Sequence, residues 1–382
     1  MSCEVIQEFL SPSQEKLVTL CMEGAGIKKS VGVKELGRVG KSGARLLLCQ
    51  PGGGSPLVVK IDNKEKIRRE YRAMKEVRGY FARDIPLLVK PRFRSGDGAL
   101  VYWHQGAVSQ EQIRDAKQFD DMVYKCKPGT REFCEGDEVI LGIFENVWKR
   151  CATARNKRNI RNEQVTLGDE YQDYMRLRKA KAILSSILSD EGRSEHVDVF
   201  GFTMCNPLWL LEQPCFKKPV RVKRGPVHGD LHANNVILDA VDNSVHFIDF
   251  AWAEKKKHVL VDYVLMENSL RFLLFPHYVN PERQLDADKL LLEPDGAQKL
   301  AEAKSDCYLG RHYQRLGLIL SKIRTQARQY FQDLGFAEYL AAQFLILFGQ
   351  VTYPDYNQVM AVRALGLIAT ELRKGFGSDA LA

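Results

Sequence analysis

The alternation of hydrophobic and polar residues predicts strands in the first part of the chain. Between residues 30 and 106, short apolar runs are separated by glycine-rich turns. The predicted strands cover residues 31–36, 44–50, 57–61, 89–94 and 99–103. Residues 63–81 instead repeat apolar positions at helical spacing, which predicts one helix among these strands. Residues 1–29 are expected to form a short N-terminal helical extension.

From residue 107 onward the pattern is mostly helical. The predicted helices cover residues 109–124, 135–155, 167–189, 259–274, 297–333 (continuous or broken) and 336–372 (broken near Tyr353–Pro354). One short hairpin, residues 235–239 with 246–250, is the only interruption that we expect. The pattern predicts an α+β fold, with a small antiparallel β-sheet and one helix in an N-lobe (30–106) and a large, mainly α-helical C-lobe (107–382).

Polar residues gather around the predicted hairpin. Residues 227–239 read VHGDLHANNVILD, and residues 246–250 read HFIDF. Asp230 and Asn235 precede the first strand and Asp249 ends the second, so their side chains can converge on one Mg²⁺ site. Hard oxygen ligands of this kind suit a Mg²⁺ ion that is shared with substrate phosphates. The remaining aspartate can then accept a proton from an attacking hydroxyl.

Two charged residues of the first part are predicted to pair. Lys60 lies in the apolar strand 57–61 and points to the same face as Val58. The following helix carries one carboxylate within its apolar stripe: Ile67, Glu70, Met74, Val77 and Phe81. An inward-facing carboxylate needs a cationic partner, and Lys60 is the expected one. The alternative is a partly exposed Glu70 at the edge of the stripe.

These motifs resemble the kinase catalytic loop, His-x-Asp-x-x-x-x-Asn, followed by the Asp-Phe metal motif. The sequence HGDLH at 228–232 looks like the aminoglycoside phosphotransferase-like branch, which includes choline and fructosamine kinases. Residues 248–272, IDFAWAEKKKHVLVDYVLMENSLRF, look closest to the ternary complex associated, aminoglycoside phosphotransferase-like domains of bacterial conflict and signalling systems. The resemblance implies a bilobal protein-kinase-like fold with ATP and Mg²⁺ as cofactors.

The resemblance also implies roles for individual residues. Asp230 would be catalytic, Asn235 and Asp249 would hold Mg²⁺, and Lys60, fixed by Glu70, would bind the α/β-phosphates of ATP.

Further contacts to ATP are implied for a glycine-rich turn, a hinge and the catalytic loop. The turn GRVGKSG (Gly37, Gly40, Gly43) would cover the phosphates, although its glycine spacing departs from that of protein kinases. Trp103 and Gln105 fall in the segment VYWHQG, which matches the hinge at adenine; plain core packing is the alternative for Trp103. His232 is expected to support the loop or to face phosphate.

The charge of the chain bears on its partners. It has 56 Lys+Arg against 48 Asp+Glu, a net charge of +8, which counts against a cationic aminoglycoside as acceptor. Basic runs at 149–161 and 217–224 are either solvated surface or a site for an anionic substrate or partner. Neither run interleaves aromatic residues for base stacking, so nucleic acid is not an expected partner. A protein partner stays open.

The cysteines and the apolar segments indicate where the protein works. The nine cysteines include no Cys-x-x-Cys pair and are expected to be reduced thiols. The longest apolar stretch, residues 339–348, is about half of a membrane span, and no signal peptide is visible. We therefore expect a cytoplasmic protein without a membrane partner.

Together these features predict an ATP-dependent phosphotransferase, a kinase that moves the γ-phosphate of Mg-ATP to a hydroxyl of an unidentified small molecule. Residues 250–261 contain no Ser, Thr or Tyr, so a phosphorylation-ordered activation segment is not expected. Two alternatives stay open: a nucleotide-binding pseudokinase or scaffold in a signalling or defence complex, and a kinase with a protein or nucleotide acceptor.

Overall fold

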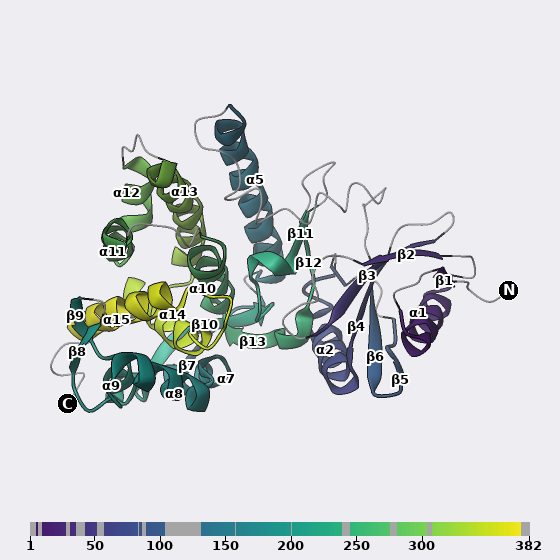
Figure 1. Ribbon diagram of the computed structural model, residues 1–382, viewed down its shortest axis with the longest axis horizontal. Helices are drawn as coiled ribbons and strands as arrows, with labels where there is room; N and C mark the ends of the chain where they lie inside the picture. Colours follow the sequence, from purple (N-terminus) through teal and green to yellow (C-terminus); the bar gives the residue numbers. More distant parts are fainter. Residues whose placement is uncertain are drawn as a thin grey trace. The chain divides into compact units, whose positions relative to one another are not determined.

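The computed structural model describes most of the chain (Figure 1). The described residues are 5–6, 10–27, 31–35, 43–51, 57–82, 84–85, 89–103, 131–156, 158–199, 201–238, 245–275, 281–303 and 308–375. The chain divides into two compact units. Unit 1 comprises residues 1–121, 149–155 and 226–255, and unit 2 comprises residues 122–148, 156–225 and 256–382. Each unit is discontinuous in sequence, so the segment with the predicted catalytic hairpin belongs to the same unit as the first strands.

Unit 1 is built on a six-stranded sheet with the order β1-β2-β3-β4-β6-β5. Its strands are β1 (Val5–Ile6), β2 (Val31–Glu35), β3 (Arg45–Pro51), β4 (Leu57–Asn63), β5 (Arg92–Arg94) and β6 (Asp97–Trp103). All neighbouring strands pair antiparallel except β1 and β2, which pair in parallel. A separate hairpin joins β11 (Val236–Leu238) to β12 (Val245–Phe247), close to its predicted place.

A helix packs on each face of this sheet. Alternate residues of a strand point to opposite faces. In β4, Leu57, Val59 and Ile61 join one hydrophobic core with Leu17 and Val18 of α1 (Pro12–Gly24). The predicted N-terminal helix is therefore present, and it closes one face of the sheet as part of the unit's core.

The other face of the sheet belongs to α2 (Lys64–Val77), whose apolar stripe was predicted. The side chain of Asn63 caps this helix by accepting a hydrogen bond from the backbone N–H of Glu65, 2.9 Å. The buried residues of α2 are Ile67, Glu70, Met74 and Val77, so the inward-facing interpretation of Glu70 is confirmed.

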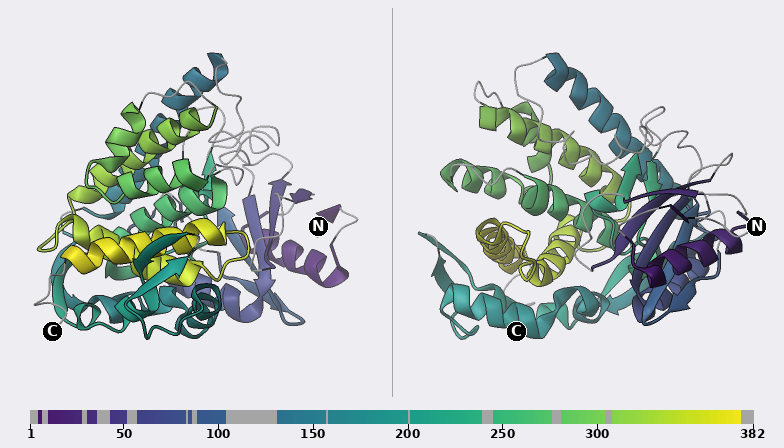
Figure 2. Two further views of the ribbon diagram at one scale, coloured as in Figure 1. Left: turned by 60° about the vertical axis from the view of Figure 1, so that its left-hand side comes forward. Right: turned by 45° about the vertical axis from the view of Figure 1, so that its right-hand side comes forward.

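Unit 2 is mainly helical. The helices that follow unit 1's sheet, α5 being shared between the units, are α5 (Arg131–Ala154), α6 (Leu167–Glu170), α7 (Gln172–Met175), α8 (Leu177–Leu188), α9 (Pro207–Leu211), α10 (Leu260–Asn268), α11 (Pro281–Leu290), α12 (Gly296–Glu302), α13 (Tyr308–Arg328), α14 (Phe336–Gln350) and α15 (Gln358–Gly375). Residues 338–350 of α14 are all buried, and this helix packs against α10 and α15 (Figure 2). The α+β fold class predicted from the sequence is confirmed.

The expectation of a single hairpin in the helical part is wrong. A three-stranded sheet has the order β13-β10-β7, with β7 (Arg161–Thr166), β10 (Pro219–Val227) and β13 (Glu254–His258). A second hairpin pairs β8 (His196–Val199) with β9 (Phe202–Cys205). These strands were missed because charged and polar residues dilute their hydrophobic alternation.

Two of the predicted helices are not seen as single described helices. The predicted helix at 167–189 is divided into α6, α7 and α8, with Arg176 in the left-handed region at φ 45° between the last two. The predicted helix 109–124 lies outside the described residues.

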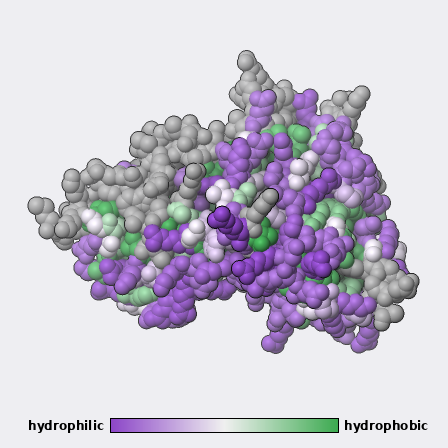
Figure 3. Space-filling view, turned by 180° about the vertical axis from the view of Figure 1, so that it is seen from behind, coloured by the Kyte–Doolittle hydropathy of each residue, from purple (hydrophilic) through white to green (hydrophobic). Residues whose placement is uncertain are grey.

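Among the described residues, no helix is both long enough and apolar enough to cross a membrane. On the face seen in Figure 3, the described surface is mostly hydrophilic, with hydrophobic residues in small groups.

Candidate active site

Lys60 lies between two carboxylates in unit 1. Its Nζ is 2.9 Å from Oε2 of Glu70 on α2 and 2.8 Å from Oδ2 of Asp249, which directly precedes the 3₁₀ turn η3 (Phe250–Trp252). The side chains of Lys60 and Glu70 are 6% and 1% exposed, whereas that of Asp249 is 29% exposed. The predicted pair of Lys60 and Glu70 is therefore present, and Asp249 joins it.

This arrangement shifts the pKa values of all three groups. Burial disfavours the charged form of Lys60, but the carboxylates of Glu70 and then Asp249 outweigh it and raise the pKa of the ammonium. Burial raises the pKa of Glu70 to about 7, against the lowering effect of Lys60. Asp249 is also penalised by burial, yet Lys60 holds the pKa of its carboxyl below the usual value. The ammonium of Lys60 thus pairs with two carboxylates, and the pKa is raised for the more buried of the two, Glu70.

The loop before β11 is held together by hydrogen bonds. His228 is fully buried and its Nε2 lies 2.9 Å from the backbone oxygen of Ile248, while its Nδ1 accepts from the backbone N–H of Asp230 at 3.4 Å. Nδ2 of Asn235 donates to the backbone oxygen of Asp230 at 2.7 Å. The backbone N–H of Ile248 donates to the oxygen of Asn235 at 3.1 Å. These bonds place Asp230, Asn235 and the residue before Asp249 side by side.

The donor set fits a magnesium ion. Nδ2 of Asn235 is used by the loop, which leaves its Oδ1 as an acceptor, and Oδ2 of Asp249 is used by Lys60, which leaves its Oδ1. Hard oxygen donors of this kind suit Mg²⁺, which completes its shell with phosphate oxygens and water. In the described part of the chain, no three or more His, Cys, Asp or Glu side chains gather into a metal site, so the pair would depend on such added ligands.

Two residues of this region adopt left-handed backbone conformations. Asp249 has φ 63° and ψ 64°, which is uncommon for a residue with a side chain. Gly229 has φ 79°, and a Cβ there would lie 2.0 Å from the backbone oxygen of Trp252. Residues held in such conformations cluster at functional sites, where the surrounding structure fixes them.

The ion pair of Asp84 and Arg150, which is largely buried, stabilises the β11–β12 hairpin. Oδ1 of Asp84 accepts from the backbone N–H of Phe247 at 3.0 Å and lies 3.0 Å from Nη1 of Arg150. Burial raises the pKa of Asp84 even though Arg150 acts to lower it. The ring of Phe81 packs against both Phe247 and Phe250. No local sequence pattern points to Asp84, because its partners are far away along the chain.

Some residues of each basic run have a structural role that neither interpretation included. Arg150 is 14% exposed and paired with Asp84, and Nε of the buried Arg155 donates to the backbone oxygen of Pro226 at 3.0 Å. In the second run, Arg224 of β10 pairs with Glu163 of β7, 3.1 Å apart. Part of each run is thus structural, whereas residues such as Arg158 and Arg221 are exposed.

Of the other predicted ATP-binding residues, the structure describes Gly43, Trp103 and His232. Gly37, Gly40 and Gln105 lie outside the described residues. Gly43 has φ 80° with open space at its Cβ position, and Trp103 pairs with Leu57 at the end of β6. Nε2 of His232 lies 3.8 Å from Oδ2 of Asp230, so His232 is brought to the catalytic loop. Their predicted roles toward ATP stay predictions.

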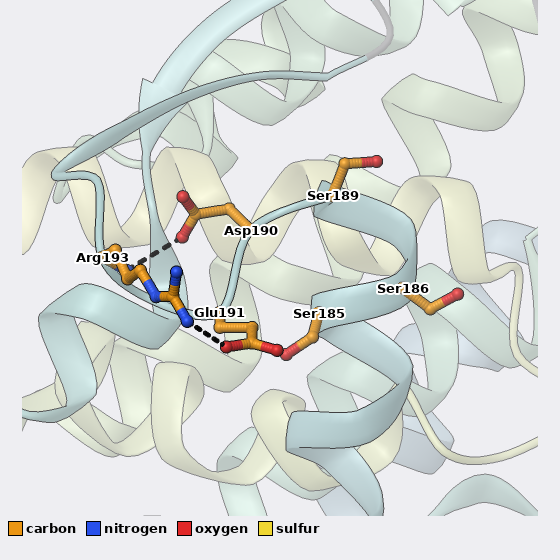
Figure 4. Close-up of a pocket in the computed structure, with 6 residues that line it drawn as sticks. All are labelled: Ser185, Ser186, Ser189, Asp190, Glu191 and Arg193. Atoms are coloured by element: carbon orange, nitrogen blue, oxygen red, sulfur yellow. Dashed lines mark hydrogen bonds and ion pairs between the residues drawn. The ribbon is translucent and has the colours of Figure 1, made fainter.

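Unit 2 contains a polar hollow beside the end of α8 (Figure 4). It is lined by Ser185, Ser186, Ser189, Asp190, Glu191 and Arg193, none of them a predicted site residue. Asp190 accepts from the backbone N–H of Arg193 at 3.0 Å, and Arg193 pairs with Glu191 at 2.9 Å. These bonds stabilise a turn, and the hollow shows no chemistry of its own.

Solved structures with partial likeness to the chain include phosphotransferases and kinases. The apo form of a thermostable mutant of aminoglycoside phosphotransferase APH(4)-Ia is 13% identical, with a TM-score of 0.44, over 95% of this chain and 100% of that one. A putative fructosamine-3-kinase from Thermobifida fusca is 13% identical, with a TM-score of 0.39, over 91% of this chain and 98% of that one. An ethanolamine kinase from Plasmodium vivax is 11% identical, with a TM-score of 0.30, over 92% of this chain and 82% of that one. At scores this low, none of these likenesses says what the chain binds or does.

Family models give a more specific result. No curated protein matches the chain. Residues 173–347 match the family model described as ternary complex associated domain 9. The matched segment of this chain begins in α7 and ends in α14. The chain is therefore similar over residues 173–347 to the ternary complex associated domains, as its motifs predicted.

Proposed function

We propose that this protein is an ATP-dependent phosphotransferase that moves the γ-phosphate of Mg-ATP to a hydroxyl of a small molecule. The observation that carries the proposal is the position of Lys60 between Glu70 and Asp249, 2.9 and 2.8 Å away. A lysine held by a helical glutamate next to a metal-binding aspartate is the arrangement with which kinases bind nucleotide phosphates. All three residues belong to unit 1, together with the catalytic loop.

Each residue would make a distinct contribution. Lys60 would donate hydrogen bonds to phosphate oxygens, with Glu70 fixing its position. Asn235 and Asp249 would hold Mg²⁺, which neutralises charge on the phosphates when bound. Asp230, whose side chain is 32% exposed, would orient the acceptor hydroxyl and take its proton. Because the chemistry needs little covalent help, positioning and charge neutralisation would supply most of the rate enhancement.

The segment after Asp249 offers no hydroxyl group for phosphorylation. Residues 250–261 contain no Ser, Thr or Tyr, and Lys60 contacts both Glu70 and Asp249. This supports a constitutively assembled enzyme. The net charge of +8 favours a neutral or anionic acceptor over a cationic one.

Transfer can be tested with γ-labelled ATP, Mg²⁺ and pooled hydroxyl compounds. The wild type should label at least one compound, and Asp230→Asn should abolish labelling while leaving ATP affinity nearly unchanged. The exposed Asp286 offers a matched control, since Asp286→Asn changes a carboxylate far along the chain. Transfer by Asp230→Asn at the wild-type rate would contradict the assigned role of Asp230.

A second candidate is a nucleotide-binding scaffold that does not transfer phosphate. One observation favours it: residues 173–347 match a family described as ternary complex associated, which suggests partner proteins. Mg-ATP binding by the wild type without ADP formation in any pool would support this candidate. ADP formation that depends on Asp230 would exclude it.

A further inference from the structure

We propose that Arg69 and Trp252 form a clamp that positions the metal-binding loop against α2, an inference that rests on the proposed function. The guanidinium carbon of Arg69 lies 4.1 Å from the centroid of the Trp252 ring. Trp252 ends η3, the turn that begins directly after Asp249. A guanidinium stacked on an aromatic face is attracted to it, most strongly when the ring is that of tryptophan. We call this contact the Arg69–Trp252 clamp.

Two consecutive residues of α2 thus hold the same loop at two points. Glu70 acts through Lys60, whose ammonium contacts Asp249. Arg69 contacts Trp252 directly, and Trp252 lies three residues after Asp249 in the sequence. Helix α2 packs against η3 over this whole segment. If η3 moved away from α2, both contacts would break, so the clamp restricts where the Asp249 carboxylate can lie.

Trp252 also contacts the catalytic loop. A Cβ on Gly229 would lie 2.0 Å from the backbone oxygen of Trp252, a distance that only glycine can tolerate. Gly229 directly precedes Asp230, the proposed base. The backbone of Trp252 therefore lies directly against the predicted catalytic loop, while its ring stacks on Arg69 of α2. Through this one residue, the proposed base and the proposed metal ligand keep a constant spacing.

The clamp gives a fixed order to a segment that phosphorylation cannot order. Between Asp249 and Asp262 there is no Ser, Thr or Tyr. Arg69 is a positioning residue in this scheme, because it contacts Trp252 and reaches no proposed ligand of Mg²⁺ itself. Its loss should weaken Mg²⁺ binding without removing any metal ligand.

The neighbouring residue provides a matched control. The guanidinium carbon of Arg68 lies 5.1 Å from the centroid of the Phe93 ring on β5, so it makes the same kind of contact from the same helix. Arg68→Ala removes this contact without touching η3. Arg69→Lys and Trp252→Phe keep a cation and a ring, and should retain part of the effect that Arg69→Ala and Trp252→Ala lose.

The first measurement needs no nucleotide. Hydrogen–deuterium exchange of residues 245–258 should be about 3- to 30-fold faster in Arg69→Ala than in the wild type, as expected for loss of one such contact. In Arg68→Ala the same segment should exchange at the wild-type rate. Equal exchange in Arg69→Ala, Arg68→Ala and the wild type would overturn the clamp.

The second measurement couples the clamp to the metal. At saturating ATP, the Mg²⁺ concentration that gives half of the thermal stabilisation should rise about 3- to 10-fold in Arg69→Ala, with partial rescue in Arg69→Lys. A wild-type response in Arg69→Ala would overturn the positioning role even if exchange is faster. A wild type that Mg-ATP does not stabilise would instead overturn the proposed function, and the exchange result separates the two failures.

Discussion

The ammonium of Lys60 and the carboxylate of Asp249 are in direct contact, with Nζ and Oδ2 2.8 Å apart. Glu70 approaches the same ammonium at 2.9 Å, so one positive charge faces two negative charges in a largely buried place. Burial raises the pKa of Glu70 against the lowering effect of Lys60, and the neighbouring carboxylate of Asp249 adds to the rise. A bound Mg²⁺ would relieve the imbalance, which is why we regard these residues as one site.

Loss of Glu70 should impair the site through Lys60. In Glu70→Ala, Lys60 keeps only Asp249 as a partner and is no longer held for phosphate binding. We expect kcat/KM for ATP to fall roughly 10- to 100-fold, the size of effect seen when a residue that orients a functional side chain is lost. Glu76→Ala, at an exposed position of α2, should have the same kcat/KM for ATP as the wild type. Full activity in Glu70→Ala would show that the ion pair has no functional role.

A buried charge cluster in unit 2 should make stability depend on pH. Glu267 is fully buried; burial opposes its charge, but Arg324 and then Arg271 lower its pKa to about 2 from 4.5. Because the unfolded chain takes up this proton first, the stabilisation is fully present above pH 4.5 and is lost as the pH falls towards 2. Tyr339 and Gln343 also donate to its carboxylate, at 2.8 and 2.9 Å.

Glu267→Gln tests this cluster. At pH 7 it should lower the free energy of unfolding by about 3–5 kcal/mol, because the buried guanidinium of Arg324 loses its carboxylate partner and that of Arg271 keeps only Asp288. Below the usual pKa of the carboxyl, the difference from the wild type should shrink. Glu293→Gln breaks an exposed pair with Lys299, which keeps Asp295 as a partner, so this variant should unfold at nearly the same urea concentration as the wild type. Equal unfolding midpoints in urea for the two variants would contradict the account.

The first helix should be required for the stability of unit 1. Leu17 is fully buried in the core that α1 shares with the sheet. Leu17→Ala should cost about 2–5 kcal/mol, as typical for a cavity in a core. Glu23 is exposed on the same helix, so Glu23→Ala should leave the unfolding midpoint nearly unchanged. A negligible effect of Leu17→Ala would mean that α1 is dispensable.

A methyl group at Gly229 should disrupt the catalytic loop. Gly229→Ala faces both a φ of 79° and a clash with the backbone oxygen of Trp252, so we expect activity to be lost and stability to fall. Gly201 also has φ 79° but has open space at its Cβ position. Gly201→Ala therefore isolates the backbone strain, about 1 kcal/mol. If both variants behave alike, the close approach of Gly229 to Trp252 has no consequence.

The sequence predicted the parts of the site that depend on local periodicity. The alternation in β4 placed Lys60 and Val58 on one face, and the stripe of α2 placed Glu70 inward; the 2.9 Å pair follows from both. The hairpin was also predicted, because turn residues separate its two short apolar strands.

Contacts between distant segments could not be predicted in this way. The pair of Asp84 and Arg150 joins a loop after α2 to the end of α5, and neither residue breaks a local pattern. Arg150 stood in a basic run that was interpreted as surface or partner site. Strand β10 intersperses valine with lysine and arginine, and Arg224 among them pairs with Glu163 on the neighbouring strand and with Glu170 of α6.

The central claim is that unit 1 holds Mg-ATP, and calorimetric titration of ATP with and without Mg²⁺ tests it most directly. We expect ATP to bind the wild type in a Mg²⁺-dependent manner, Asp249→Ala to lose this dependence, and Asp286→Asn to retain it. Heat of binding that is equal in Asp249→Ala and the wild type, or no binding of any nucleotide to the wild type, would contradict the proposed site.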